Sequence, residues 1–178
     1  MSYDFDFLSP EPGLRDSFLE QMKHILPELQ VSQWEENTLS IHWNEVQVSF
    51  FSGITLKALS PLISYQHLYL LDKPDIIAMK IAAMMQRATI RDYFDIATLL
   101  QFENIALSQM IDYFYEKYGD QGSQFSKSLI LKTLSHTEDV PEEDLRILSH
   151  LGYWSSKGST LKETITAVLH EKAKEMLK

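Results

Sequence analysis

Two carboxylates near the start of the chain have the spacing of a metal site. Asp4 and Asp6 stand two residues apart in 3–7, where aromatic and acidic residues alternate. This alternation is typical of a β-strand, on which residues two apart share one face. Adjacent carboxylates repel each other, and a cation between them relieves the repulsion, as in Mg²⁺ sites for phosphoryl transfer. The spacing also fits a solvated end with two surface acids, although the aromatic face favours a packed strand.

A second charged group lies in the otherwise apolar stretch that begins at Asp75. It comprises Lys80, Arg87, Arg91, Asp92 and Asp95. On a helix, Lys80 and Arg87 are two turns apart and share a face. These two cations could reach solvent, form ion pairs with Asp92 and Asp95, or contact a nucleotide triphosphate. Arg91 is also one turn from Asp95 and could pair with it. From spacing alone the ion pairs are favoured.

The order of elements that must position these residues indicates a β-rich front and a helical back. Alternating and apolar segments predict strands at 3–7, 38–43, 46–51 and 67–71, with a two-residue turn at Asn44 and Glu45. Helical spacing predicts helices at 14–26, 75–87, from 89 onward, 108–118, 123–134, 142–151 and from 160 onward. Capping boxes are expected at Thr89 with Asp92 and at Thr160 with Glu163. We therefore expect the α+β class.

Composition limits the classes of function. The chain has 178 residues, of which 44% are apolar and 11% aromatic, so it can bury a core. It has no cysteine, which excludes disulfides, thiolate catalysis and cysteine-bound zinc. A formal net charge of −9 argues against broad, charge-driven nucleic-acid binding but permits a small basic pocket. Without a signal peptide or a membrane-length apolar run, a soluble cytoplasmic protein with no membrane partner is expected.

The stretch from Asp75 to Asp95 resembles the signature of the AbiEii/AbiGii-type nucleotidyltransferase toxins of abortive infection. That signature has an Asp, an Ala, Lys-x-x-Ala, an Arg and then Arg/Lys-Asp-x-x-Asp. The strand with Asp4 and Asp6 is similar to the Asp-x-Asp metal strand of the same family. The resemblance covers roughly residues 2–150, and its most specific part runs from Lys80 to Asp95.

The resemblance implies a fold related to DNA polymerase β and transfer of a nucleotide from an NTP, often to RNA such as the tRNA acceptor end. It also implies a cognate antitoxin. By position, Asp4 and Asp6 would hold Mg²⁺ and Lys80 would contact the triphosphate. The catalytic set would be completed by Asp92 and Asp95, and nucleotide binding by Arg87 and Arg91. The implied architecture is a shortened nucleotidyltransferase β-rich core at 1–71, followed at 72–178 by a helical region that completes it and forms a C-terminal subdomain.

Two departures from the family pattern argue against activity. The family's Gly-Gly-Ser/Thr phosphate cradle precedes the Asp-x-Asp strand by some twenty residues, whereas this chain begins three residues before Asp4. We expect either an internal methionine at position 1 or a truncated gene. Ser49 stands where the family has a third carboxylate, and serine is a poor Mg²⁺ ligand. Glu45 is close in sequence but belongs to the expected turn.

Two hypotheses follow. The first is a Mg²⁺-dependent nucleotidyltransferase of the toxin type, acting on an RNA or protein acceptor. The alternative is a non-catalytic, degenerate homologue that acts as an interaction or regulatory module. The first predicts that Asp4 and Asp6 lie in one cleft with Lys80 and the acids Asp92 and Asp95. The second predicts that Lys80 and Arg87 are held in ion pairs with Asp92 and Asp95.

Overall fold

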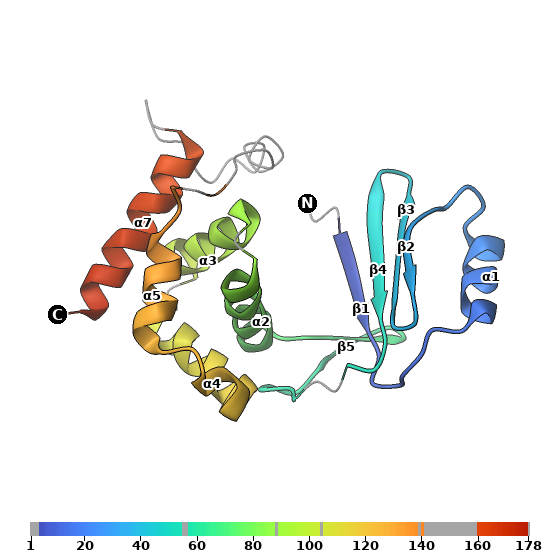
Figure 1. Ribbon diagram of the computed structural model, residues 1–178, viewed down its shortest axis with the longest axis horizontal. Coiled ribbons are helices and arrows are strands. Elements are labelled where there is room, and N and C mark those ends of the chain that lie inside the picture. The colour runs from blue at the N-terminus through green and yellow to red at the C-terminus, as the bar shows by residue number, and fades with distance from the viewer. Residues whose placement is uncertain are drawn as a thin grey trace. The chain divides into compact units, whose positions relative to one another are not determined.

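The computed structural model describes residues 4–54, 57–87, 89–103, 105–138, 140 and 160–177. The chain divides into two compact units, Met1–Lys57 and Ala58–Lys178. The expected α+β class is confirmed, because a mixed four-stranded sheet is followed by a series of helices (Figure 1). The domain division expected between residues 71 and 72 stays a prediction. The helix expected at 142–151 lies outside the described residues.

The first unit is built on a four-stranded sheet in the order β1-β4-β3-β2. Its strands are β1 (Asp4–Leu8), β2 (Gln30–Glu35), β3 (Thr38–Trp43) and β4 (Val46–Phe51). β1 runs parallel to β4, and the other pairs are antiparallel. Asn44 and Glu45 form the expected two-residue turn with φ angles of 47° and 66°, as a type I′ hairpin requires. β2 was not expected, because a register shift between Val31 and Gln33 interrupts its alternation.

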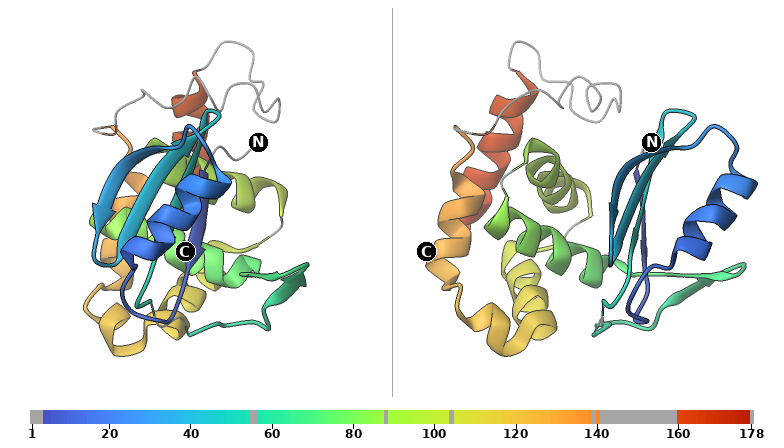
Figure 2. Two further views of the ribbon diagram at one scale, coloured as in Figure 1. Left: turned by 90° about the vertical axis from the view of Figure 1, so that its right-hand side faces the viewer. Right: turned by 45° about the vertical axis from the view of Figure 1, so that its right-hand side comes forward.

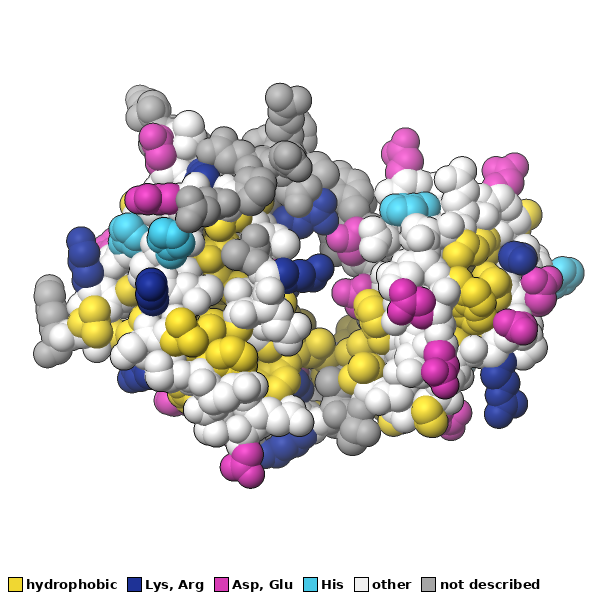
Figure 3. All heavy atoms as spheres, in the orientation of Figure 1, with side chains coloured by type: hydrophobic (Ala, Val, Ile, Leu, Met, Phe, Trp, Pro, Cys, Tyr) yellow, Lys and Arg dark blue, Asp and Glu magenta, His cyan; other side chains and the backbone are white. Residues whose placement is uncertain are grey.

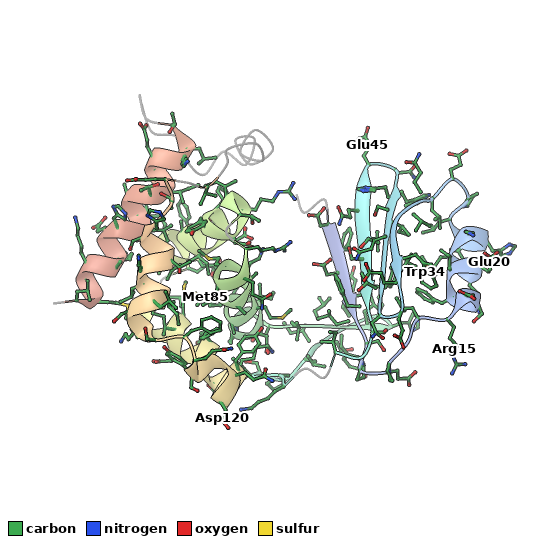
Figure 4. The ribbon with its side chains drawn as sticks, in the orientation of Figure 1. Arg15, Glu20, Trp34, Glu45, Met85 and Asp120 are labelled. Carbon is green, nitrogen blue, oxygen red and sulfur yellow. The ribbon has the colours of Figure 1, made fainter. Side chains whose placement is uncertain are left out.

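One face of this sheet is apolar and is covered by helix α1 (Asp16–Ile25), as Figure 2 shows. Phe18 of α1 meets Phe50 edge-on, with ring centroids 5.0 Å apart, and Phe7 stacks on Phe50 at 5.1 Å. Leu39 and Ile41 of the central strand β3 are fully buried. Figure 4 shows Trp34 between β2 and α1. The helix expected at 14–26 is therefore confirmed, with its end just before Pro27, and the sheet's apolar face forms this unit's core.

The second unit begins with a small hairpin, β5 (Ile63–Tyr65) and β6 (Leu68–Leu70), and is otherwise helical. Its described helices are α2 (Lys73–Gln86), α3 (Ile90–Phe102), α4 (Leu107–Ser123), α5 (Lys127–Ser135) and α7 (Leu161–Met176). All five contribute to one apolar core, against which Met85, labelled in Figure 4, is packed. None of the helices in the described ranges is long and apolar enough to cross a membrane.

The helix ends differ in part from the sequence expectations. The capping box at Thr160 and Glu163 is confirmed in both of its hydrogen bonds. The capping box expected at Thr89 is wrong. The Thr89 hydroxyl donates to the Asp92 carboxylate (2.6 Å) instead of accepting a hydrogen bond from a backbone N–H group. α4 does not end before Gly119. That glycine kinks the helix, with a φ of 49° that favours glycine, and the helix then resumes.

Candidate functional site

The carboxylates of the first unit lie on the polar face of the sheet, opposite α1. Asp4 and Asp6 are both exposed on β1. In the parallel register Asp4 lies beside Gln47, and Asp6 lies beside Ser49. Side chains in register on neighbouring strands project from the same face. The sheet therefore presents two adjacent carboxylates on one face while its other face packs against the helix.

Ser49 occupies the position beside Asp6 where a third carboxylate would complete the expected metal site. It is 3% exposed, and its hydroxyl accepts a hydrogen bond from Ser40 on the next strand at 3.2 Å. Glu45, an acid close to Ser49 in sequence, stands at the tip of the β3–β4 hairpin (Figure 4). The register thus places a hydroxyl pair, and no acid, next to Asp6 on β4 and β3.

The donor set of this face is compatible with a Mg²⁺ ion that arrives with a nucleotide. Within the described ranges, no group of three or more His, Asp or Glu side chains could hold a metal ion. Mg²⁺, however, commonly takes one or two protein carboxylates and completes its shell with water and substrate phosphates. Asp4 and Asp6 supply that minimum.

A three-residue charge cluster lies in the second unit, where α2 and α3 meet. The Lys80 ammonium is 2.7 Å from Asp95 Oδ2 and 3.1 Å from Asp92 Oδ1. The Asp92 side chain is 4% exposed, whereas those of Lys80 and Asp95 are 32% and 40% exposed. The second Asp92 oxygen accepts the Thr89 hydroxyl. The cluster therefore has a buried acid at its base and a lysine and a second acid at the surface.

The local sequence explains why these charges meet. α2 buries Ile77, Ile81 and Met84 in the core, which leaves Lys80 at the margin of the buried face. Only a short connection separates α2 from α3, so the first turn of α3 returns beside α2 (Figure 1). Asp92 and Asp95 are three residues apart on α3 and therefore share a side of it.

The electrostatics of the cluster keep the lysine charged. Burial by itself lowers the pKa of Lys80, but the charges and hydrogen bonds of Asp95 and Asp92 outweigh burial and raise it above its ordinary value. The expected ion pairs of Lys80 with both acids are thus confirmed. Arg87 is different: it is exposed at the end of α2 and forms no ion pair with any residue that the structure describes. The expected pairing of Arg87 with the acids is wrong, because the extended backbone at Arg87 ends the helical spacing on which it was based.

Arg91 lies in the first turn of α3. Its predicted ion pair with Asp95 stays a prediction. Figure 3 shows Lys and Arg side chains gathered beside α2 and α3. The acids Asp92 and Asp95 lie on one of these helices, so the local excess of positive charge is small.

Asp75, the first residue of the charged stretch, has a structural partner that sequence reasoning missed. Its side chain is fully buried, and its carboxylate is 2.5 Å from the ammonium of Lys117 on α4, which is 3% exposed. The backbone N–H groups of Leu59 and Ser60 also donate to it. Burial raises the pKa of Asp75, but Lys117 and these N–H groups outweigh burial and hold it below its ordinary value.

A signal for this pair was present in the sequence. Lys117 follows Met110 and Phe114 at spacings of seven and three, so it falls on the buried stripe of α4. A lysine on an apolar stripe requires an acid partner. Sequence spacing could not select which of the many acids supplies it.

Comparison with known proteins finds a family match. Residues 1–153 match the family described as "Nucleotidyl transferase AbiEii toxin, Type IV TA system". The chain belongs to the AbiEii family. No curated protein and no solved structure matches it. The match includes both carboxylates of β1 and the whole stretch from Asp75 to Asp95, whereas α7 lies beyond it.

Membership of the AbiEii family has coarse functional consequences. The chain belongs to a family of nucleotidyltransferase-like toxins involved in abortive infection, whose members generally use an NTP and Mg²⁺. A type IV toxin–antitoxin system implies a cognate antitoxin. Of the predicted site residues, the structure brings together Lys80, Asp92 and Asp95 in the second unit. Asp4 and Asp6 lie together in the first unit.

Proposed function

We propose that this AbiEii-family chain transfers a nucleotide from an NTP to an RNA acceptor such as tRNA, or to a protein acceptor. The observation that carries the proposal is the cluster of Lys80 with Asp92 and Asp95. It keeps a cation protonated, oriented and partly exposed within the family's signature. These substrates occur in the cytoplasm, so the proposal places the protein there.

Lys80 is suited to bind the triphosphate while it stays in its ion pairs. A lysine ammonium has three N–H donors. Two of them are directed to Asp92 and Asp95, which leaves the third for a phosphate oxygen. The two acids restrict the lysine's rotamers, so less side-chain freedom is lost when a phosphate binds. The exposed guanidinium of Arg87, and Arg91 on the next helix, would add positive charge for the phosphates.

Asp4 and Asp6 would hold Mg²⁺ on the polar face of the sheet. When bound, Mg²⁺ neutralises the phosphate charge that develops during transfer. The strand places the two carboxylates on one exposed face of the sheet, where one cation could bind both. Phosphoryl transfer depends chiefly on such positioning of charges.

Three variants test the proposal. Lys80→Gln keeps a hydrogen-bond donor beside Asp92 but removes the charge. It should weaken NTP binding in calorimetry by about 10- to 100-fold, which corresponds to the loss of one charge-assisted hydrogen bond. Lys73→Gln is the matched control, because Lys73 is on the same helix in an exposed pair with Glu103 and should bind as the parent does. With labelled NTPs, Mg²⁺ and total tRNA, Asp4→Ala should abolish label transfer. Equal NTP binding by both lysine variants would contradict the role of Lys80.

Two observations favour a second candidate function, a non-catalytic homologue that acts as an interaction or regulatory module. One is the pairing of Lys80 with Asp92 and Asp95, which this candidate also predicts. The other is the hydroxyl of Ser49 beside Asp6, where the family pattern has a third carboxylate. This candidate predicts neither Mg²⁺ nor NTP binding in calorimetry. Ser49→Asp discriminates between the two candidate functions. It should increase nucleotide transfer if the parent is a weakened enzyme, and transfer should stay at zero if the parent is a non-catalytic homologue. Circular dichroism of Ser49→Asp must show a native spectrum, because the position is buried.

A further inference from the structure

A hollow of about 460 Å³ opens at one end of the helical unit, away from the residues discussed above. It lies among the end of α3, the start of α4, the start of α5 and the end of α7. Figure 1 shows α5 and α7 side by side, and the two helices are in contact. None of Lys80, Asp92 and Asp95 lines this hollow. Its volume is within the range of small-molecule sites, about 300–1,000 Å³.

The floor of the hollow is apolar. Leu100, Ile105, Leu107 and Met176 contribute to it. Leu100 and Leu107 are 6% and 3% exposed and belong to the core, so this part of the floor is held rigidly. Met176 is a flexible and polarisable side chain, which adapts well to a flat ring. Such a floor fits a planar, largely apolar group.

The rim of the hollow is positively charged. Lys127 and Lys172 line it from two different helices, together with one acid, Glu175, which pairs with Lys172 at 3.0 Å. Lys127 is the first residue of α5, where a cation opposes the helix dipole, and the first turn of α5 has no acid to compensate. Within the described part of the chain, Lys127 forms no ion pair. The rim therefore has an excess of one positive charge on a chain of net charge −9.

We propose that this hollow binds a nucleotide unit, with its base on the apolar floor and its phosphate between Lys127 and Lys172. Compact ammonium groups are suited to phosphate as point charges. Neither the floor alone nor the lysines alone specify such a ligand, but a planar apolar group joined to a phosphate ester satisfies both. The ligand is a free nucleoside monophosphate or a nucleotide within an RNA strand, since both present the same chemistry.

The test measures binding without Mg²⁺ or NTP, so that it does not depend on the proposed transfer reaction. Calorimetry with the full chain would compare adenosine 5′-monophosphate, adenosine and a short oligoadenylate. The monophosphate should bind at least about tenfold more tightly than adenosine, because only it engages the lysines. Tighter binding of the oligoadenylate would identify an RNA strand as the source, and equal binding would identify the free nucleotide.

Matched double variants locate the site. Lys127→Gln with Lys172→Gln should weaken monophosphate binding by at least about tenfold. Lys132→Gln with Lys174→Gln removes the same charge from the same two helices, at exposed positions outside the hollow, and should bind as the parent does. Lys80→Gln should also leave this binding unchanged. Equal losses in the two double variants, or no preference for the monophosphate over adenosine, would overturn the proposal whether or not the chain transfers nucleotides.

Discussion

Removal of Lys117 should strongly destabilise the helical unit, because it leaves the Asp75 carboxylate buried without a counter-charge. The side chains of Asp75 and Lys117 are 0% and 3% exposed, so water cannot replace the lost partner. Breaking such a pair costs about 3–5 kcal/mol. In Lys117→Met the linear side chain retains most of the packing, and Leu59 and Ser60 still donate to the carboxylate. We therefore expect a loss near the lower value, about 3 kcal/mol.

The assay is urea unfolding followed by circular dichroism at 222 nm, where the signal is dominated by the helical unit. With a denaturant slope of about 2 kcal/mol per molar, a loss of about 3 kcal/mol lowers the midpoint by about 1.5 M. Lys73→Met is the matched control in the same unit. Lys73 pairs with Glu103 at 2.5 Å, but the two side chains are 56% and 43% exposed. Its loss should cost no more than about 0.5 kcal/mol.

A second substitution separates charge from packing. Asp75→Asn alone leaves the buried ammonium of Lys117 without its acid and should be about as destabilising as Lys117→Met. The double variant has no buried charge, and its amide oxygen can still accept the N–H groups of Leu59 and Ser60. It should therefore be more stable than the sum of the single losses predicts, by about 2 kcal/mol.

The pH dependence gives an independent signature. In the parent the pKa of Asp75 is lowered, so the pair's stabilisation is complete above the unfolded-state value of about 3.9 and is lost as pH falls through the lower folded-state value. In Lys117→Met, burial should raise the pKa of Asp75 above its unfolded value. The folded variant then takes up a proton as pH falls through this raised pKa, above the unfolded-state value, and its deficit relative to the parent should shrink over that range. A loss below about 1 kcal/mol at pH 7, or a deficit that does not change with pH, would refute the reasoning.

Two further substitutions test other parts of the fold. Tyr93→Phe removes a phenol that donates to the carbonyls of Thr133 (2.9 Å) and His136 (3.2 Å) at the end of α5, and urea unfolding should show a loss of about 1–2 kcal/mol. Tyr113→Phe, whose hydroxyl has only an exposed partner, should stay within about 0.5 kcal/mol of the parent. Glu45→Gly should stabilise the first unit by about 0.5 kcal/mol or more in unfolding followed by tryptophan fluorescence, because glycine adopts a φ of 66° without strain. Glu36→Gly, in the β2–β3 turn without a positive φ, should give no such gain.

Local features of this chain could be predicted because neighbouring residues determine them. The β3–β4 hairpin follows from two apolar, alternating segments around Asn44 and Glu45. The capping box of Thr160 and Glu163 depends on residues three apart. The expected pairing of Lys80 with Asp92 and Asp95 also succeeded, because a short connection between two helices brings their facing turns together.

Errors arose where hydrogen bonding or pairing departs from the simple pattern. β2 was not predicted, because its register shift interrupts the alternation of apolar and polar residues that marks a strand. Thr89 has the sequence of a cap, but its hydroxyl donates to the side chain of Asp92. Gly119 was expected to end α4. Its φ is positive, as at a helix end, but the chain resumes the helix after it.

By itself the sequence determined the α+β order of elements and the AbiEii resemblance, and it named candidate residues for nucleotide binding, because these depend on residue type and short spacing. The tertiary structure decided which acid neutralises Lys117, 42 residues from Asp75, and which side chain lies beside Asp6. It also brought Lys127 and Lys172 to one hollow. The physical reason is that charge and hydrogen-bond partners distant in the chain are selected by how helices and strands pack. That packing depends on all the apolar side chains together and cannot be derived from any single motif.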